Sequence, residues 1–166
     1  SDANNRIIPD LIDFTKTFFA KHTILSILTR YCVFTAENML LVMRPYQITA
    51  TERILNRIEI ANNYKKYGRV AGGGYIWHTT GSGKTLTSYK ATRNLLMDIP
   101  AIDKAIFLID RKDLDAQTTM AFQAYANNDL IDVDETDNVN DLKKKLKSDD
   151  RQVIVTTIQK LQRLIT

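Results

Sequence analysis

The stretch His78-Thr79-Thr80-Gly81-Ser82-Gly83-Lys84-Thr85 decides the fold of this chain. Its two glycines allow a tight backbone turn that points amide N–H groups inward. The residues that follow predict a helix, whose N-terminal dipole adds positive potential at the same place. Lys84 supplies a full positive charge, and the Thr85 hydroxyl is placed to ligate Mg²⁺. The stretch therefore predicts a phosphate-binding loop over residues 78–85.

One position departs from the strict form of this motif, because His78 stands where the pattern has its first glycine. We interpret His78 as a loop residue without a catalytic role. The surrounding sequence fits the motif, since an apolar segment, the glycine loop, Lys84-Thr85 and a helix-length stretch occur in the required order. This context supports a nucleotide-binding loop despite the mismatch.

Three short apolar segments, at 74–78, 105–110 and 152–156, predict buried parallel strands. A helix-length stretch at 84–97 separates the first two, and connections of this length imply right-handed crossovers. The sequence therefore predicts an α/β fold whose parallel sheet is covered by helices on both faces.

The residues before the loop predict mainly helices. Apolar and aromatic side chains recur at helical spacing in three segments, 11–19, 24–31 and 46–64. The run 39–43 is too short for its periodicity to separate a strand from a buried helix. We therefore predict a helical lead-in or linker over residues 1–43 and one α/β domain over residues 44–166.

The charges of this chain are unevenly distributed. Six of the 19 acidic residues lie within 129–141, so the rest of the chain holds 23 basic residues against 13 acidic ones. Such a surplus suits an anionic partner such as nucleic acid or nucleotide, although a solvated basic surface explains it equally well.

The cysteine and histidine content excludes several kinds of site. Cys32 is the only cysteine, so there is no disulfide framework, and the chain is typical of a reducing, cytoplasmic compartment. Cys32, His22 and His78 cannot supply a zinc ligand set. No apolar run approaches the roughly 18 to 20 residues that a membrane-spanning helix needs, so we expect no membrane partner.

Residues on either side of the loop resemble motifs of the superfamily-two helicases. Arg44-Pro45-Tyr46-Gln47 resembles the adenine-recognition motif, residues 107–117 resemble motif Ia, and residues 153–161 resemble motif Ib. The resemblance implies a phosphate-loop NTPase with a recombinase-like parallel sheet and flanking helices. It also implies that ATP and Mg²⁺ are the cofactors and that motifs Ia and Ib contact a nucleic-acid backbone.

The resemblance assigns roles to individual residues. Tyr46 and Gln47 would recognise adenine, since a glutamine amide can both donate to and accept from the adenine edge. The residues implied to hold nucleotide and magnesium are Thr80, Gly81, Ser82, Gly83, Lys84, Thr85 and Leu86. Among them Lys84 and Thr85 would be catalytic, and Thr85 would be the metal ligand.

Nucleic acid would contact the elements 110–117 and 156–160, through Arg111, Thr157 and Gln159. A surface ion pair with a neighbouring aspartate explains Arg111 as an alternative. An ordinary strand end explains Thr157 in the same way.

The strings Trp77 to Thr85 and Asp110 to Gln117 resemble, more specifically, the motor subunit of type I restriction-modification enzymes. What this resemblance implies is an ATP-driven double-stranded DNA translocase in the cytoplasm. It would pull DNA toward a complex of modification and specificity subunits, and a separate nuclease domain would cleave the DNA. The resemblance extends from Arg44 to the C-terminus.

The chain also departs from the full family pattern. The Asp-Glu pair that holds magnesium and activates water should follow motif Ib and is not in this chain. Asp134-Glu135 precedes the motif Ib segment, and we interpret it as solvated loop. The second motor lobe is absent too, so we expect this chain to bind ATP without efficient turnover or cleavage. Pro9-Asp10 and Asp110-Arg111-Lys112 are too far apart in the sequence to be accepted as a nuclease pair.

Two alternatives remain open. The chain could belong to another superfamily-two motor, a DNA or RNA helicase, although the string at 110–117 argues against it. It could instead be a nucleotide-dependent interaction module, in which ATP binding positions the N-terminal helices against partner subunits.

Overall fold

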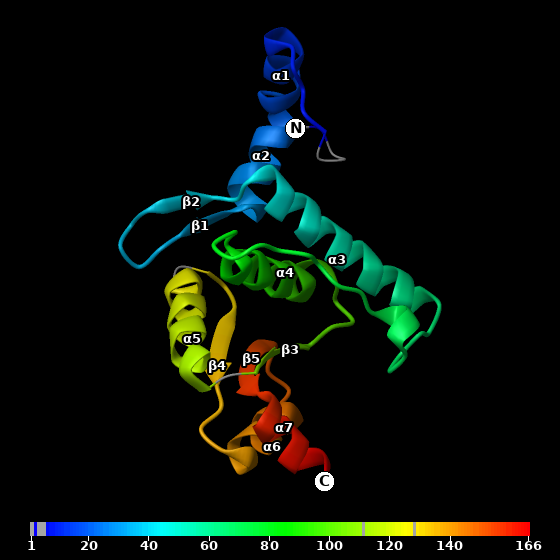
Figure 1. Cartoon of the computed structure of the whole chain (residues 1–166), viewed down its shortest axis with the longest axis vertical. Coiled ribbons are helices and arrows are strands. Elements are labelled where there is room, and N and C mark those ends of the chain that lie inside the picture. The colour runs from blue at the N-terminus through cyan, green and yellow to red at the C-terminus, as the bar shows by residue number, and fades with distance from the viewer. Residues whose placement is uncertain (1, 3–5, 111, 128) are drawn as a thin grey trace. The chain divides into compact units, whose positions relative to one another are not determined.

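The computed structural model describes residues 2, 6–110, 112–127 and 129–166, with the backbone alone for 112–117 (Figure 1). The chain divides into two compact units. The first comprises Ser1–Val33 with Leu40–Ala91, and the second comprises Phe34–Met39 with Thr92–Thr166. The division into a lead-in over 1–43 and a domain over 44–166 remains a prediction.

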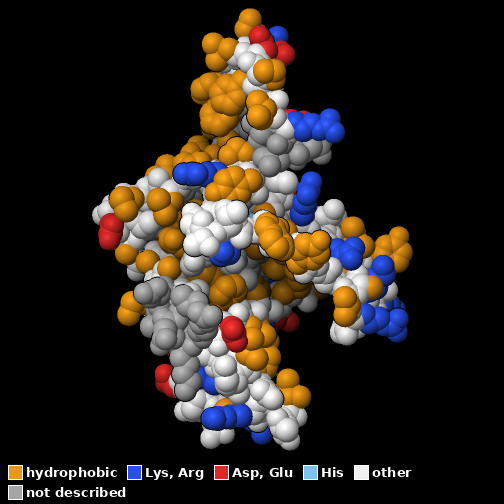
Figure 2. Space-filling view, in the orientation of Figure 1, with side chains coloured by type: hydrophobic (Ala, Val, Ile, Leu, Met, Phe, Trp, Pro, Cys, Tyr) orange, Lys and Arg blue, Asp and Glu red, His pale blue; other side chains and the backbone are white. Residues whose placement is uncertain are grey.

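Two short helices, α1 (Leu11–Phe18) and α2 (Lys21–Arg30), open the first unit. The Asp10 side chain accepts a hydrogen bond of 2.9 Å from the Asp13 amide and so caps α1. Hydrophobic side chains gather over α1 and α2 in the upper part of Figure 2, and Leu11 and Phe19 are among the exposed ones. The helices predicted in this region are confirmed, and their apolar side chains are left largely uncovered.

The undecided run 39–43 contains a strand. β2 (Leu40–Val42) pairs with β1 (Cys32–Phe34) in a two-stranded sheet. The next helix, α3 (Pro45–Asn63), begins at Pro45, where the missing N–H of proline costs nothing because the first helical amides have no partner. This confirms the helix predicted over 46–64.

The chain returns from the end of α3 through the short 3-10 helix η1 (Val70–Gly72). The Arg57 guanidinium ties this return to α3, because it donates to the carbonyls of Ala71 and Gly73, each at 2.9 Å. The return therefore runs back along α3 toward the phosphate loop.

The strand predicted over 74–78 is wrong. This segment has no regular secondary structure, and Tyr75 and Trp77 are each 88% exposed. The physical reason is that a strand needs a neighbour for its backbone N–H and C=O groups. None of the described strands pairs with residues 74–78.

The second unit is built on a parallel sheet of three strands in the order β3-β5-β4. They are β3 (Lys104–Ile109), β4 (Asp132–Glu135) and β5 (Gln152–Thr157). The central strand aligns Phe107 of β3 with Val155 and Val133 of β4 with Val153. The strands predicted over 105–110 and 152–156 are confirmed, and so is their parallel direction.

The strand β4 corrects the interpretation of Asp134-Glu135 as solvated loop. Acidic residues disfavour strands, but β4 is held by its parallel pairing with β5. Buried Ile131 and Thr136 fix the two ends of the strand. Tertiary pairing therefore outweighs local propensity at this place.

Four helices complete the structure: α4 (Lys84–Asp98), α5 (Lys112–Ala126), α6 (Val139–Lys147) and α7 (Ile158–Ile165). Helix α5 packs on the sheet, with the Phe122 ring 4.8 Å from that of Phe107. All six residues of β5 are buried, so the prediction of a sheet covered on both faces holds for its central strand. It does not hold for β3, whose Ile106 and Leu108 are each 42% exposed. Within the described sheet, β3 pairs with β5 alone and has an open outer edge.

Candidate functional site

The phosphate loop lies immediately before α4 in the first unit. Gly81 and Gly83 have φ angles of 75° and 74°, a left-handed conformation that side chains disfavour. A Cβ atom on Gly83 would also come within 2.5 Å of the Gln47 amide nitrogen. The Ser82 amide closes the turn by donating to the Thr79 carbonyl at 3.3 Å. The tight turn predicted from the two glycines is confirmed.

The first turn of α4 holds Lys84, Thr85 and Leu86. The first backbone bond of the helix joins the Thr87 amide to the Gly83 carbonyl at 3.1 Å, so the three preceding amides lie at the open N-terminus. The Lys84 ammonium donates to the Thr79 carbonyl at 3.3 Å. A phosphate group fits this arrangement, because amides, a helix dipole and an ammonium group meet at one loop.

Magnesium also fits this loop. Mg²⁺ prefers one or two protein oxygens together with phosphate and water oxygens. The Thr85 hydroxyl, half-buried beside the Lys84 charge, supplies such an oxygen. In the part of the chain that the structure describes, no group of three or more His, Cys, Asp or Glu side chains could hold a metal ion.

Tyr46 and Gln47, the predicted adenine-recognition residues, bond to the phosphate loop. The Tyr46 hydroxyl donates to the Ser82 carbonyl at 2.9 Å. The Gln47 amide nitrogen donates to the carbonyls of Ser82 and Gly83 at 3.3 and 3.2 Å, and its oxygen accepts from the Arg44 amide at 2.8 Å. In this structure the two side chains thus shape the loop, and their recognition of adenine remains a prediction.

A hollow of about 630 Å³ opens beside the loop. It is lined by residues 75–82, by Arg44 at the N-cap of α3, and by one face of α3 made of Tyr46, Thr49, Ala50 and Arg53. The volume falls in the range of small-molecule sites. Its lining combines two arginines with aromatic side chains and includes no acidic residue, so it suits an anionic ligand that has an aromatic ring.

Sequence reasoning gave no role to the two arginines of this hollow: Arg44 was noted only as part of a motif, and Arg53 was missed. Tyr46, Thr49, Ala50 and Arg53 stand at positions i, i+3, i+4 and i+7, which places them on one face of α3. Because this spacing is visible in the sequence, it could have placed Arg53 on the same helix face as Tyr46.

The second predicted site lies at the ends of the parallel strands in the second unit. Arg111 falls outside the described residues. Thr157 is buried at the end of β5, and its hydroxyl caps α7 by accepting from the Lys160 amide at 3.3 Å. The Gln159 amide nitrogen donates to the Asp110 carbonyl at 3.2 Å. Gln159 therefore links the start of α7 to the residue after β3. These two places belong to the predicted nucleic-acid elements 156–160 and 110–117.

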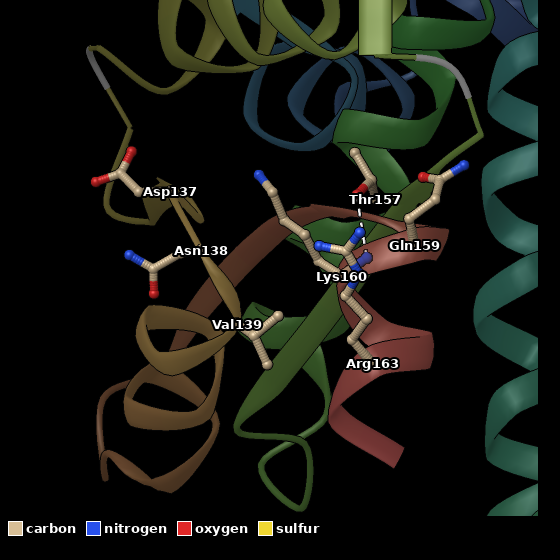
Figure 3. Close-up of a pocket in the computed structure, with 7 residues that line it drawn as sticks. All are labelled: Asp137, Asn138, Val139, Thr157, Gln159, Lys160 and Arg163. Carbon is tan, nitrogen blue, oxygen red and sulfur yellow. Dashed lines mark hydrogen bonds between the residues drawn. The ribbon is translucent and has the colours of Figure 1, made fainter. Parts of the chain in front are cut away.

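A second hollow, of about 450 Å³, lies at this end of β5, and Figure 3 shows the residues that line it. Its lining residues are Asp137, Asn138, Val139, Thr157, Gln159, Lys160 and Arg163. No hydrogen bond or ion pair joins the Arg163 guanidinium to another described residue. Sequence reasoning singled out Thr157 and Gln159 but not Lys160 or Arg163, because two basic residues three positions apart on one short helix carry little signal.

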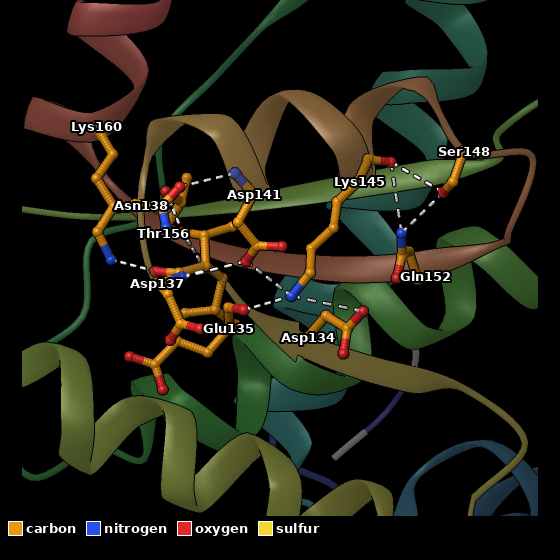
Figure 4. Close-up of polar contacts among 12 residues, drawn as sticks. Asp134, Glu135, Asp137, Asn138, Asp141, Lys145, Ser148, Gln152, Thr156 and Lys160 are labelled. Carbon is orange, nitrogen blue, oxygen red and sulfur yellow. Dashed lines mark hydrogen bonds and ion pairs between the residues drawn. The ribbon is translucent and has the colours of Figure 1, made fainter.

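Two lysines contact the acidic region formed by β4, the turn after it and the start of α6 (Figure 4). Lys145 donates to the Glu135 carbonyl and lies 3.3 Å from an Asp141 carboxylate oxygen and 3.7 Å from one of Asp134. Lys160 donates to the Thr136 carbonyl. Burial alone raises the pKa of Asp141, but the Asp137 N–H and the Lys145 ammonium together hold that pKa below its ordinary value.

Comparison with known proteins agrees with the geometry of the loop. Residues 46–165 match the model of the SWI2/SNF2 ATPase family. The C-terminal part of the endonuclease subunit of the type I restriction enzyme MpnIIP, from Mycoplasma pneumoniae, is 47% identical over 99% of this chain and 80% of that protein. The chain belongs to the SWI2/SNF2 ATPase family and to the endonuclease subunits of type I restriction enzymes.

Other members of this family are much longer. The endonuclease subunit of the type I restriction enzyme SsaAORF53P, from Staphylococcus saprophyticus, is 43% identical over 99% of this chain, which spans 16% of that subunit. That of EcoprrI, from Escherichia coli, is 60% identical over 34% of this chain and 18% of its own length. The resemblance predicted from the motif strings and the phosphate-loop ATPase fold are confirmed, and so is the assignment of the intact protein to a class of enzymes. No helix among the described residues is long and apolar enough to span a membrane.

Proposed function

We propose that this chain is the ATP-binding part of an ATP-dependent double-stranded DNA translocase in a type I restriction enzyme of the cytoplasm. The observation that carries the proposal is the left-handed glycine turn of the phosphate loop, which leads directly into the N-terminus of α4 beside a basic, aromatic-lined hollow. Because the chain belongs to the endonuclease subunits of type I restriction enzymes, the loop would act in an enzyme of that kind.

The phosphate side of the proposed site uses the loop 78–85. The backbone amides of the loop and of the first turn of α4, as far as Leu86, would receive the phosphate oxygens. Lys84 would exchange its bond with the Thr79 carbonyl for the β- and γ-phosphates. Thr85 would ligate Mg²⁺, which when bound neutralises charge on the phosphates.

The base side of the proposed site lies in the hollow along α3. Tyr46, Tyr75 and Trp77 supply aromatic surface for adenine, while Arg44 and Arg53 supply positive charge. Gln47 would recognise the adenine edge only after giving up part of its present bonding to the loop. Nucleotide binding and loop shape are thus linked through one side chain.

Turnover needs further groups. Asp134 and Glu135 do not serve as the missing magnesium-binding pair, because both lie in β4, where the Asp134 carboxylate is 3.7 Å from the Lys145 ammonium of α6 and Glu135 accepts from that ammonium through its backbone carbonyl. We therefore propose that the intact subunit, with its second lobe, turns over ATP and that this chain binds it.

The DNA side of the proposal rests on the second unit. Motifs at 110–117 and 156–160 follow adjacent parallel strands, so both lie at the carboxyl edge of the sheet. Gln159 joins them through the Asp110 carbonyl, and Arg163 adds a positive charge in the hollow that Thr157 lines. Basic groups of this kind bind the phosphate backbone irrespective of sequence. Modification and specificity subunits are the proposed protein partners.

A second function is favoured by one observation. Apolar side chains of α1 and α2, including Leu11, Ile12 and Leu25, are exposed to solvent. An interaction module would use these helices against another subunit or domain, with ATP binding as the control. DNA-independent binding of the chain to a modification subunit would support this function over DNA translocation.

Calorimetry with Mg-ATP and a non-hydrolysable analogue tests the proposal. We expect the unaltered chain to bind both ligands and Lys84→Ala to bind neither detectably. Lys143→Ala, an exposed lysine on α6, is the matched control and should bind as the unaltered chain does. Equal binding by Lys84→Ala and the unaltered chain would refute the assigned loop.

A further inference from the structure

His78 is the residue at which this loop departs from the strict phosphate-loop motif. It is half-buried and lines the hollow beside the loop. Its Nδ1 atom lies 2.9 Å from the Ser82 hydroxyl oxygen, and its ring centre lies 6.1 Å from that of Tyr46 in an edge arrangement. We infer that His78 is a positioning residue, which holds Ser82 and thereby sets the nucleotide-binding shape of the loop.

The hydrogen count fixes the direction of the bond between His78 and Ser82. The Ser82 hydroxyl has one proton, and it donates that proton to the Thr79 carbonyl at 2.7 Å. The hydroxyl oxygen can therefore only accept from His78. It follows that Nδ1 carries a proton and that His78 acts as the donor.

This bond matters because Ser82 connects both sides of the loop. Its amide and hydroxyl both donate to the Thr79 carbonyl, and its own carbonyl accepts from Tyr46 and Gln47. The His78 donor directs the Ser82 proton toward Thr79, which keeps the turn around Gly81 closed. A glycine at position 78 would remove one of the two side-chain bonds of the Ser82 hydroxyl and leave the one to the Thr79 carbonyl.

The same bond prepares Lys84 for its ligand. The Thr79 carbonyl accepts from the Lys84 ammonium and from the Ser82 hydroxyl. When Lys84 moves to a phosphate, the Thr79 carbonyl keeps the Ser82 amide and hydroxyl as its donors. His78 maintains the hydroxyl donor and lowers the cost of releasing Lys84.

This inference rests on the proposed binding of Mg-ATP at the loop, and affinity measurements on the full 166-residue chain test it. We expect His78→Ala to raise the Kd for Mg-ATP by roughly 2- to 10-fold, the usual effect of one hydrogen bond. His78→Asn places an amide N–H near the position of Nδ1 and should remain within about twofold of the unaltered chain. His22→Ala removes the other histidine, on α2, and should change nothing.

A double-mutant cycle separates positioning from a general loss of structure. If His78 acts through Ser82, then His78→Ala and Ser82→Ala combined should weaken binding no more than the stronger single change. Nitrogen NMR of the imidazole should show the proton on Nδ1 in the unaltered chain. Circular dichroism of each variant checks that the fold is kept.

The possible outcomes point to different conclusions. Unchanged affinity in folded His78→Ala, or equal losses in His78→Asn and His78→Ala, would overturn the inference alone. Additive losses in the cycle would also overturn it, because His78 would then act independently of Ser82. Failure of the unaltered chain to bind Mg-ATP would overturn the proposed function and this inference with it.

Discussion

Strand β5 and the segment 74–78 are alike in sequence and different in structure. Each is a short apolar run that leads into the N-terminus of a helix, α7 in one case and α4 in the other. β5 lies between two parallel neighbours and is buried throughout, whereas 74–78 pairs with none of the described strands. Backbone pairing therefore positions the first helix terminus, and side-chain contacts from Tyr46, Gln47 and His78 position the second.

The largest expected difference between β5 and the segment 74–78 is in their contribution to stability. Ile154→Ala removes a fully buried side chain from the centre of β5 and should lower the free energy of unfolding by about 2 to 5 kcal/mol. Ile76→Ala, the matched change in the unpaired segment, alters a side chain that is 42% exposed and should cost about 1 kcal/mol or less. Urea denaturation measures both. Equal costs would show that the segment 74–78 is as well supported as β5.

The next effect concerns the side chains that shape the phosphate loop. Gln47→Ala removes the donor to the Ser82 and Gly83 carbonyls and should weaken Mg-ATP binding roughly tenfold. If Gln47 acts by shaping the loop, binding of magnesium triphosphate without a base should fall equally. A loss confined to ATP would instead assign Gln47 to adenine recognition. Gln123→Ala, exposed on α5, is the control.

A smaller effect is expected at the end of β5. Gln159→Ala breaks the bond to the Asp110 carbonyl and should weaken double-stranded DNA binding by roughly 2- to 10-fold, without changing Mg-ATP binding. Fluorescence anisotropy at fixed low salt measures the DNA affinity. Gln162→Ala, exposed on the same helix, is the control. Unchanged DNA affinity in Gln159→Ala would remove this link from the proposal.

The smallest effect is a pH dependence near β4. The pKa of Asp141 is lowered on folding. The charged Asp141 carboxylate therefore stabilises the folded chain at pH values above the ordinary pKa of the group. That contribution should disappear as the pH falls from about 3.8 through the lower folded-state pKa. Melting temperatures between neutral pH and pH 3 should therefore fall less steeply for Asp141→Asn than for Asp149→Asn. If melting temperature changed with pH equally in the two variants, the contact between Lys145 and Asp141 would not be stabilising.

The predictable parts of the fold share a local signal. The glycines of the phosphate loop, the apolar strands at 105–110 and 152–156, and the helix over 46–64 were all visible in the sequence. The errors came from tertiary pairing: β4 is acidic but has a neighbour, and 74–78 is apolar but has none. The site shows the same division. The loop residues were predicted, while the hydrogen bonds from His78 to Ser82 and from Gln159 to Asp110 are visible only in the folded structure.

The open outer edge of β3 has a practical consequence for handling this protein. An edge strand with exposed Ile106 and Leu108 offers backbone groups and apolar surface to any other extended chain. We expect concentrated solutions to self-associate through β3 and precipitate on mild heating. Ile106→Lys should improve solubility.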